Sequence, residues 1–188
     1  MSKKIRFAHL ADLHLGAWRE KKLTNLNFDT FKLAIDRVIN EKVEFCLFAG
    51  DIFNNAMPPI DLVNRVVVEL MRLKESKIPL YVIGGSHDYS NSGKSFLELL
   101  DSAGVLIDVA KPEYVDKDKV NLTFTKDSSG TIISGILGRK KGLDKNIYKN
   151  LSENNLSKDN FNLFMFHCTL DDFKPDFMKA VKSEITKS

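Results

Sequence analysis

Short apolar runs alternate with longer segments whose apolar residues recur at helical spacing. Residues 5–10, 45–49 and 78–83 predict buried strands, and the second run is apolar on both faces, as in a parallel sheet. Between them, residues 24–40 and a segment that begins at Pro58 and Pro59 predict helices. This alternation of strand and helix predicts a layered α/β domain.

The pattern changes in the second half of the chain. Residues 120–125 and 131–137 flank Asp127-Ser128-Ser129-Gly130, which predicts a hairpin with a loop of four to five residues. A polar, Asn-rich stretch follows as far as Leu156, and residues 161–166 predict one more strand. The hairpin adds antiparallel pairing, so the predicted domain contains mixed sheet.

Polar clusters follow four of the apolar runs directly. They are Asp12-Leu13-His14-Leu15-Gly16, Gly50-Asp51-Ile52-Phe53-Asn54, Gly85-Ser86-His87-Asp88 and Phe166-His167-Cys168. Ligands of open α/β sheets bind beyond the carboxyl ends of the strands, so we expect these clusters to converge. Carboxylate and imidazole groups suit two divalent cations that hold a phosphate. The sequence therefore predicts a metal or phosphate site.

The spacing inside each cluster suggests roles. Asp12 and His14 are two residues apart and can reach one cation, whereas Asp51 follows a glycine that allows close approach of the backbone. A carboxylate that bridges cations about 3.5–4 Å apart is what a two-metal site requires. His87 suits an acid oriented by Asp88, although a local turn hydrogen bond is an equally good interpretation of Asp88.

Composition narrows the class of protein without deciding it. The 188 residues are 43% hydrophobic, enough for one domain with a substantial core, and no run approaches the roughly 18 apolar residues of a membrane span. The N-terminus leads directly into a strand and does not resemble a signal peptide, so we expect a cytoplasmic protein. The net charge of +3 is compatible with nucleic-acid binding but does not require it.

The four clusters resemble the signature of the calcineurin-like dinuclear metallophosphoesterase superfamily. Within it, the chain is most similar to the double-strand-break repair nucleases of the meiotic recombination eleven and SbcD type, in their archaeal form. The similarity extends to residues 9–16, 135–140 and 167–175. It implies an α/β, layered metallophosphoesterase fold with mixed β-sheets flanked by helices.

The resemblance also implies roles for single residues. The metal ligands that it implies are Asp12, His14, Asp51, Ser86 and His167. Asp12 and His14 would bind the first cation, Asp51 would bridge both, and His167 would bind the second. Ser86 stands where the superfamily has asparagine, and its shorter hydroxyl is a weaker ligand. His87 would be the catalytic residue, and the two divalent cations would be manganese.

At the level of function, the resemblance implies a metal-dependent DNA nuclease with three-prime exonuclease and single-strand endonuclease activity. DNA, an SbcC-type coiled-coil ATPase and a second copy of the chain would be its partners. The predicted helices carry candidates for an apolar homodimer face, which are Phe28, Phe31, Leu62, Val66 and Leu70, although from the residues alone it is an equally good interpretation that they simply cover the sheet. Residues 1–188 would form the N-terminal nuclease domain and would end before the family's Gly-His-x-His motif and capping domain. We therefore expect these residues alone to bind metal weakly and to show little nuclease activity.

Two other functions remain open at this point. A small-molecule metallophosphoesterase would use the same ligands. A DNA-binding scaffold subunit with a weakened catalytic site would be consistent with Ser86 and with the absent histidines.

Overall fold

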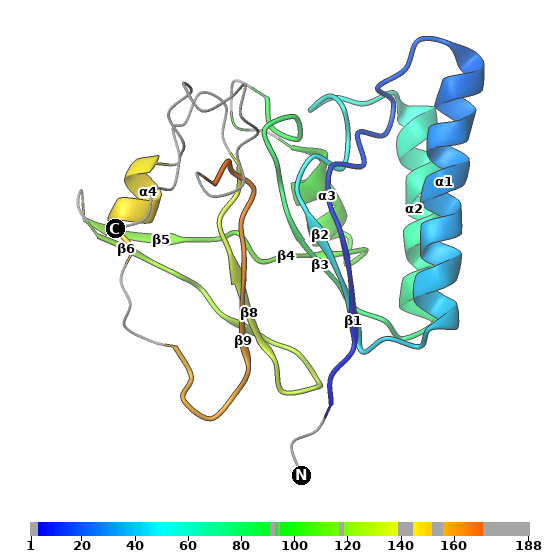
Figure 1. Cartoon of the computed structure of the whole chain (residues 1–188). Coiled ribbons are helices and arrows are strands. Elements are labelled where there is room, and N and C mark those ends of the chain that lie inside the picture. The colour runs from blue at the N-terminus through cyan, green and yellow to red at the C-terminus, as the bar shows by residue number, and fades with distance from the viewer. Residues whose placement is uncertain are drawn as a thin grey trace.

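The computed structural model describes residues 4–90, 93, 95–116, 119–138, 145–151 and 156–170 (Figure 1). The strands are β1 (Phe7–Leu10), β2 (Phe45–Ala49), β3 (Leu80–Ile83), β4 (Ile107–Asp108), β5 (Glu113–Asp116), β6 (Lys119–Asn121), β7 (Thr125–Lys126), β8 (Ile132–Gly135) and β9 (Asn162–Met165). The helices are α1 (Lys21–Asn40), α2 (Ile60–Glu75), α3 (Phe96–Ser102) and α4 (Lys145–Lys149).

The described strands form three sheets. The first is parallel, in the order β1-β2-β3-β4. The second has the order β7-β8-β9, with β7 antiparallel and β9 parallel to β8. The third is the antiparallel pair β5 and β6. The predicted α/β fold with a parallel sheet, mixed sheet and flanking helices is confirmed.

The central strand β2 separates two apolar cores, which gives the fold its layers. Because successive side chains of a strand point to opposite faces, Cys46 and Phe48 pack against α1, α2 and α3. On the other face, Phe45, Leu47 and Ala49 pack against side chains of β8 and β9. Helices, the parallel sheet and the second sheet are therefore stacked in that order, with α1 and α2 on the outside (Figure 1).

A buried polar contact joins the two sheets within the second core. The hydroxyl of Tyr81 on β3 donates to Oδ1 of Asp127 at 2.8 Å, and both residues are almost fully buried. Burial and the neighbouring carboxylate raise the pKa of Tyr81, so the hydroxyl keeps its proton. This hydrogen bond fixes the hairpin between β7 and β8 against the parallel sheet.

The prediction of a single strand over residues 120–125 is wrong. Its first residues pair with β5 as β6, and the chain then crosses to the second sheet, where its last residue belongs to β7 and pairs with β8. Sequence reasoning also missed β5, because its central side chains Tyr114 and Val115 are both exposed and give no alternation of buried and exposed positions.

Of the two interpretations of these apolar residues on α1 and α2, cover for the sheet is the one observed, and their assignment to a dimer interface is wrong. All five side chains are 9% exposed or less and belong to the core beneath the helices. They are Phe28, Phe31, Leu62, Val66 and Leu70. The exposed apolar side chains of α1 are Leu23, Leu26 and Leu33, which lie three and seven residues apart on one stripe. No helix in the described ranges is long and apolar enough to cross a membrane.

Candidate metal centre

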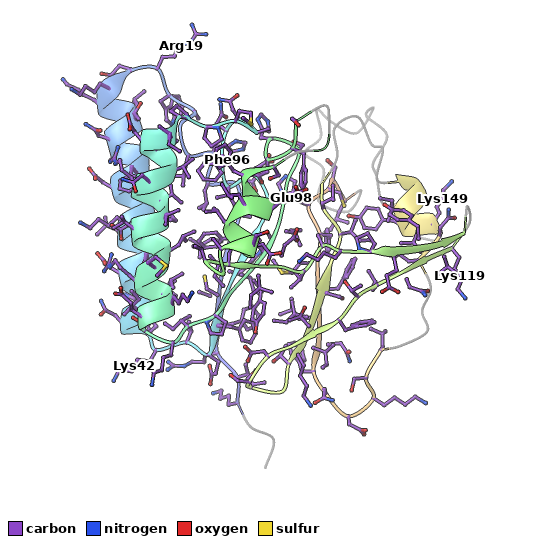
Figure 2. All side chains as sticks on the ribbon, turned by 180° about the vertical axis from the view of Figure 1, so that it is seen from behind. Arg19, Lys42, Phe96, Glu98, Lys119 and Lys149 are labelled. Atoms are coloured by element: carbon purple, nitrogen blue, oxygen red, sulfur yellow. The ribbon has the colours of Figure 1, made fainter. Side chains whose placement is uncertain are left out.

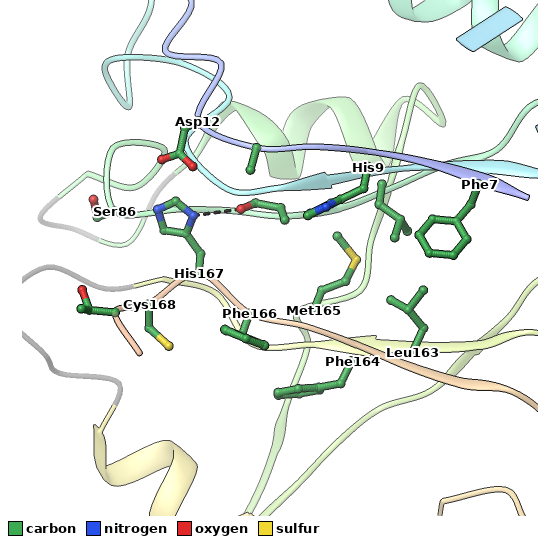
Figure 3. Close-up of a pocket in the computed structure, with 14 residues that line it drawn as sticks. Phe7, His9, Asp12, Ser86, Leu163, Phe164, Met165, Phe166, His167 and Cys168 are labelled. Atoms are coloured by element: carbon green, nitrogen blue, oxygen red, sulfur yellow. Dashed lines mark hydrogen bonds between the residues drawn. The ribbon is translucent and has the colours of Figure 1, made fainter. Parts of the chain in front are cut away.

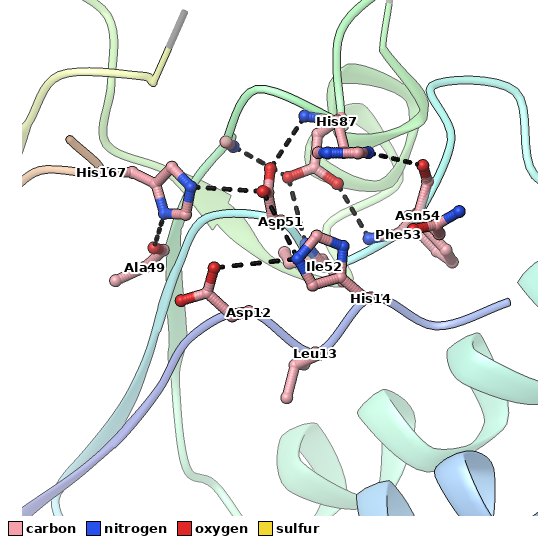
Figure 4. A network of polar contacts seen from close by, with 12 residues as sticks. Asp12, Leu13, His14, Ala49, Asp51, Ile52, Phe53, Asn54, His87 and His167 are labelled. Carbon is pink, nitrogen blue, oxygen red and sulfur yellow. Dashed lines mark hydrogen bonds and ion pairs between the residues drawn. The ribbon is translucent and has the colours of Figure 1, made fainter. Parts of the chain in front are cut away.

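The polar clusters converge at the carboxyl ends of β1, β2, β3 and β9 (Figure 4). Asp12 and His14 follow β1, and Asp51 follows β2 two residues after its end. His87 belongs to the turn after β3, and His167 follows β9 of the second sheet. The site therefore lies across the seam between the two sheets.

Three of these residues have backbone conformations that side chains rarely adopt. The φ angles of Asp12, His14 and Asp51 are 53°, 42° and 50°, in the left-handed region. Hydrogen bonds between the two loops hold this geometry, from Asp12 N–H to Gly50 O at 3.1 Å and from His14 N–H to Asp51 O at 2.9 Å. Backbone strain that neighbouring contacts maintain is typical of functional sites.

Asp51 occupies the middle of the cluster. Its Oδ2 lies 3.6 Å from Nε2 of His14 and 3.3 Å from Nε2 of His167. Its Oδ1 accepts a hydrogen bond from the backbone N–H of His87 at 2.8 Å. Burial by itself would raise the pKa of Asp51, but the contact with His167 and the N–H of His87 together lower it. Asp51 is therefore an ionised carboxylate that faces imidazoles from two sides.

A backbone carbonyl orients the His167 ring. Nδ1 lies 2.8 Å from Ala49 O, so an Nδ1–H donor there directs Nε2 towards Asp51 (Figure 4). Histidine ligands of metals are commonly held in this way through their second nitrogen. The hydrogen bond to Asp51 raises the pKa of His167 to about 9, in spite of burial, which lowers it. At neutral pH and without metal, the ring carries a proton that a cation would displace.

We expect the free energy of unfolding of the metal-free protein to fall as the pH rises from about 6.5 to about 9. The pKa of His167 is raised from 6.5 in the unfolded chain to about 9 in the folded protein. The stabilisation is therefore complete below pH 6.5 and is lost as the pH passes 9. Chemical unfolding in a chelator should measure a loss on the order of 2–3 kcal/mol. His167→Gln should flatten this dependence, and an unchanged slope in that variant would contradict the assignment.

The candidate ligand atoms fall into two groups that share Asp51. Within each group all ligand atoms lie within 4.8 Å of one another; the groups are Asp12, Asp51 and His167, and His14, Asp51 and His87. Carboxylate and imidazole donors fit divalent cations such as manganese or zinc. The sequence-based assignment paired Asp12 with His14, whereas here Asp12 shares a group with His167, although His14 Nε2 is also 3.8 Å from Asp12 Oδ1.

Ser86 lies beside the first of these groups. It lines a groove of about 800 Å³ together with Asp12 and His167, and the groove continues between β1 and β9 past His9 to Phe7 (Figure 3). The hydroxyl of Ser86 is therefore available on the side where the second cation was expected. Its role as a ligand stays a prediction.

The ring of His87 is oriented by a backbone carbonyl, and Asp88 has another role. Nδ1 of His87 lies 2.9 Å from Asn54 O. The carboxylate of Asp88 is almost fully buried and accepts N–H groups of Gly85 at 2.9 Å, Phe53 at 2.9 Å and Ile52 at 3.2 Å. Of the two interpretations of Asp88, the backbone hydrogen bond is therefore the one observed. It ties the loop of Asp51 to the turn of His87.

Sequence reasoning missed the carbonyl groups of Ala49 and Asn54 that orient the two imidazoles. Every residue has a carbonyl group, so the sequence contains no signal for them. It also missed Asn27, whose side-chain amide donates to Leu13 O at 3.1 Å and ties α1 to the loop of Asp12 and His14. An asparagine within a helix is common enough that its sequence position alone did not indicate this contact.

Fold and site together define a metallophosphoesterase. The chain belongs to the calcineurin-like phosphoesterase family, whose sequence profile matches residues 5–186. Among curated relatives, a DNA double-strand break repair protein Mre11 of Methanococcus maripaludis is 29% identical over 184 residues, which are 91% of this chain and 45% of that protein. A protein with the same name from Sulfurisphaera tokodaii is 40% identical over 91 residues, which are 45% of this chain and 22% of that protein.

The chain thus spans less than half the length of the curated relatives that it matches. Among solved structures, a dimetal phosphatase from Danio rerio is similar at 17% identity with a TM-score of 0.38, and the match covers 76% of this chain and 49% of that one.

Proposed function

We propose that residues 1–188 form the nuclease domain of a DNA double-strand-break repair protein of the Mre11 type. The reaction would be the hydrolysis of DNA phosphodiesters with two manganese ions, as a three-prime exonuclease and single-strand endonuclease. The observation that supports this most directly is Asp51, shared between two groups of candidate ligands in a family of phosphoesterases. The relatives named for double-strand break repair support DNA as the substrate.

The ligands would be Asp12, His14, Asp51 and His167, with Ser86 beside the last. Two bound cations would polarise the phosphate and activate a water for attack. Asp51, which is ionised and buried at the centre of the site, would supply the negative charge that holds both cations in place. Nε2 of His87 would donate a proton to the leaving oxygen, while Asn54 O holds the opposite edge of the ring.

Exposed side chains between the first cluster and α1 favour a nucleic-acid substrate over a small phosphoester, and Arg19 projects outwards at the N-terminal end of α1 (Figure 2). Trp18, Arg19, Lys21 and Lys22 all lie within eight positions of His14 in the sequence and are exposed to solvent. The backbone beneath Trp18 is held, because its carbonyl accepts the hydroxyl of Thr24 at 2.8 Å. An aromatic ring with cationic groups on this loop and on the first turn of α1 suits stacking on bases and contacts to phosphates.

Parallel assays with single-stranded DNA and with the chromogenic ester bis(p-nitrophenyl) phosphate test the proposal. Each candidate group offers three protein ligands, so we expect weak metal binding and slow turnover, and the assay should use excess protein and millimolar Mn²⁺. DNA cleavage that chelation abolishes is the expected result. Hydrolysis of the chromogenic ester alone would favour a small-molecule phosphoesterase. DNA binding without hydrolysis of either substrate would favour a scaffold subunit.

The proposal includes a homodimer and an SbcC-type coiled-coil ATPase as partners. For the homodimer we expect the exposed stripe of α1 to form the contact. Sedimentation at micromolar concentration should show that Leu26→Asp with Leu33→Asp shifts a dimer to a folded monomer, since both side chains are more than 60% exposed. Val66→Asp is the contrasting variant, because Val66 is fully buried and a charge there should destabilise the fold by about 4 kcal/mol. A wild-type monomer would contradict the homodimer.

A further inference from the structure

His167 lies against two glycines that have no room for a side chain. A methyl group on Gly50 would lie 2.4 Å from Nδ1 of His167. A methyl group on Gly138 would lie 2.8 Å from Cδ2 and 2.6 Å from the carbonyl oxygen of the same histidine. Methyl carbons essentially never approach other atoms to less than 3.0 Å. His167 therefore sits in a slot between the ends of β2 and β8, one from each sheet.

The two glycines are required for different reasons. Gly50 has a φ of 93°, so any side chain there would be strained whatever the space around it. Gly138 lies outside the left-handed region, so its backbone conformation is open to alanine. Within the described residues, the obstacle to a side chain at Gly138 is its contact with His167.

Gly138 is also fixed in place by a hydrogen bond to the residue that precedes the third cluster. Its N–H donates to Gly84 O at 2.8 Å, just before the turn that contains Ser86 and His87. The segment after β8 therefore cannot move away from His167 without losing this bond. A side chain at position 138 would instead move His167.

We propose that Gly138 is a positioning residue for His167, an inference that rests on the proposed metal centre. Cδ2 is bonded to Nε2, so a methyl group that displaces Cδ2 also displaces the nitrogen that faces Asp51 at 3.3 Å. Relief of the contact requires a shift of at least a few tenths of an ångström. Metal–ligand distances tolerate only about 0.2 Å. The bare backbone at Gly138 thus sets the ligand geometry of the group formed by Asp12, Asp51 and His167.

Gly138→Ala tests this inference, with Gly135→Ala as the matched control. Position 135 is also a glycine outside the left-handed region, and its methyl group would lie 2.6 Å from Cγ2 of Ile83 and 3.1 Å from the carbonyl oxygen of Met165, so that it meets the second core and not His167 itself. Mn²⁺ titration followed by electron paramagnetic resonance should show that Gly138→Ala weakens one of two ions by about 10–100-fold. Gly135→Ala should lower the unfolding temperature and leave both affinities unchanged. Equal effects of the two variants on Mn²⁺ would mean that Gly138 is merely structural and would overturn the inference.

A crystal structure of metal-free Gly138→Ala separates this inference from the proposed function. We expect the distance from Nε2 of His167 to Oδ2 of Asp51, which is 3.3 Å with glycine at position 138, to change by at least a few tenths of an ångström, whether or not the protein cleaves DNA. An unchanged distance would overturn the inference, whereas a wild-type protein that binds no Mn²⁺ would count against the proposed function alone. If Gly138→Ala does not fold, the double variant with His167→Ala should recover a folded protein, because without the ring in its slot the backbone of residue 167, whose carbonyl oxygen lies 2.6 Å from the added methyl group, is free to shift. Failure of that recovery would show that the contact with His167 is not the obstacle at position 138 and would also overturn the inference.

Discussion

Asp51→Asn should lower Mn²⁺-dependent hydrolysis by roughly 10³–10⁴-fold and should weaken the binding of both cations. The carboxylate is the one side chain that both candidate ligand groups share, and it faces Nε2 of His14 and of His167. Stabilisation of the transition state by bound cations is worth several kcal/mol, and each 1.36 kcal/mol corresponds to a factor of ten in rate. The neutral amide keeps the shape of the side chain and removes the charge, so the effect reports electrostatics and not packing.

A second buried carboxylate provides the control for this variant. Asp127 is as inaccessible to solvent as Asp51, but it accepts the hydroxyl of Tyr81 on the far side of the second core. Asp127→Asn should lower the unfolding temperature and leave the stoichiometry of Mn²⁺ unchanged. Single substitutions of His14 or His167 by alanine should each reduce binding of one cation more than of the other. Binding of two Mn²⁺ ions by Asp51→Asn with the affinities of the unmodified protein would refute the shared carboxylate.

The position of the site could be predicted from the sequence because apolar runs end directly at the polar clusters. Parallel strands bring their carboxyl ends to one edge, so Asp12, Asp51 and His87 had to be neighbours once those strands were recognised. His167 was harder to predict, since its strand belongs to the second sheet. Its contact with Ala49 O joins the two sheets at this point.

The face that each helix presents could not be predicted in the same way. Phe28 and Phe31 face the sheet, whereas Leu26 and Leu33 of the same helix are exposed, and both pairs fit a helical repeat. Apolar periodicity therefore predicts the helix but leaves its rotation about its axis undetermined. The same limit applies to the sharing of ligands, because proximity in sequence indicates only that Asp12 can reach His14, whereas the fold brings Asp12 close to both His14 and His167.

His87→Ala should reduce hydrolysis by about 10²–10⁴-fold and leave Mn²⁺ binding close to that of the unmodified protein. A general acid acts through its side chain. Residue 87 also contacts Asp51 through its backbone N–H, and this contact does not depend on the side chain. The N–H of His87 donates to Oδ1 of Asp51 at 2.8 Å, and alanine retains that donor. The turn itself is held by Asp88, which the substitution does not touch.

The competing assignment makes His87 a ligand, since it shares a group with His14 and Asp51. In that case His87→Ala should lose one cation, and added Mn²⁺ should restore part of the activity. Asp88→Asn serves as the control for damage to the turn, because an amide cannot accept N–H groups from both Ile52 and Phe53 through two oxygens. That variant should be destabilised by about 1–3 kcal/mol. Loss of turnover in His87→Ala, with both cations bound and an unchanged unfolding temperature, would assign the proton donor to the imidazole that Asn54 O holds in place.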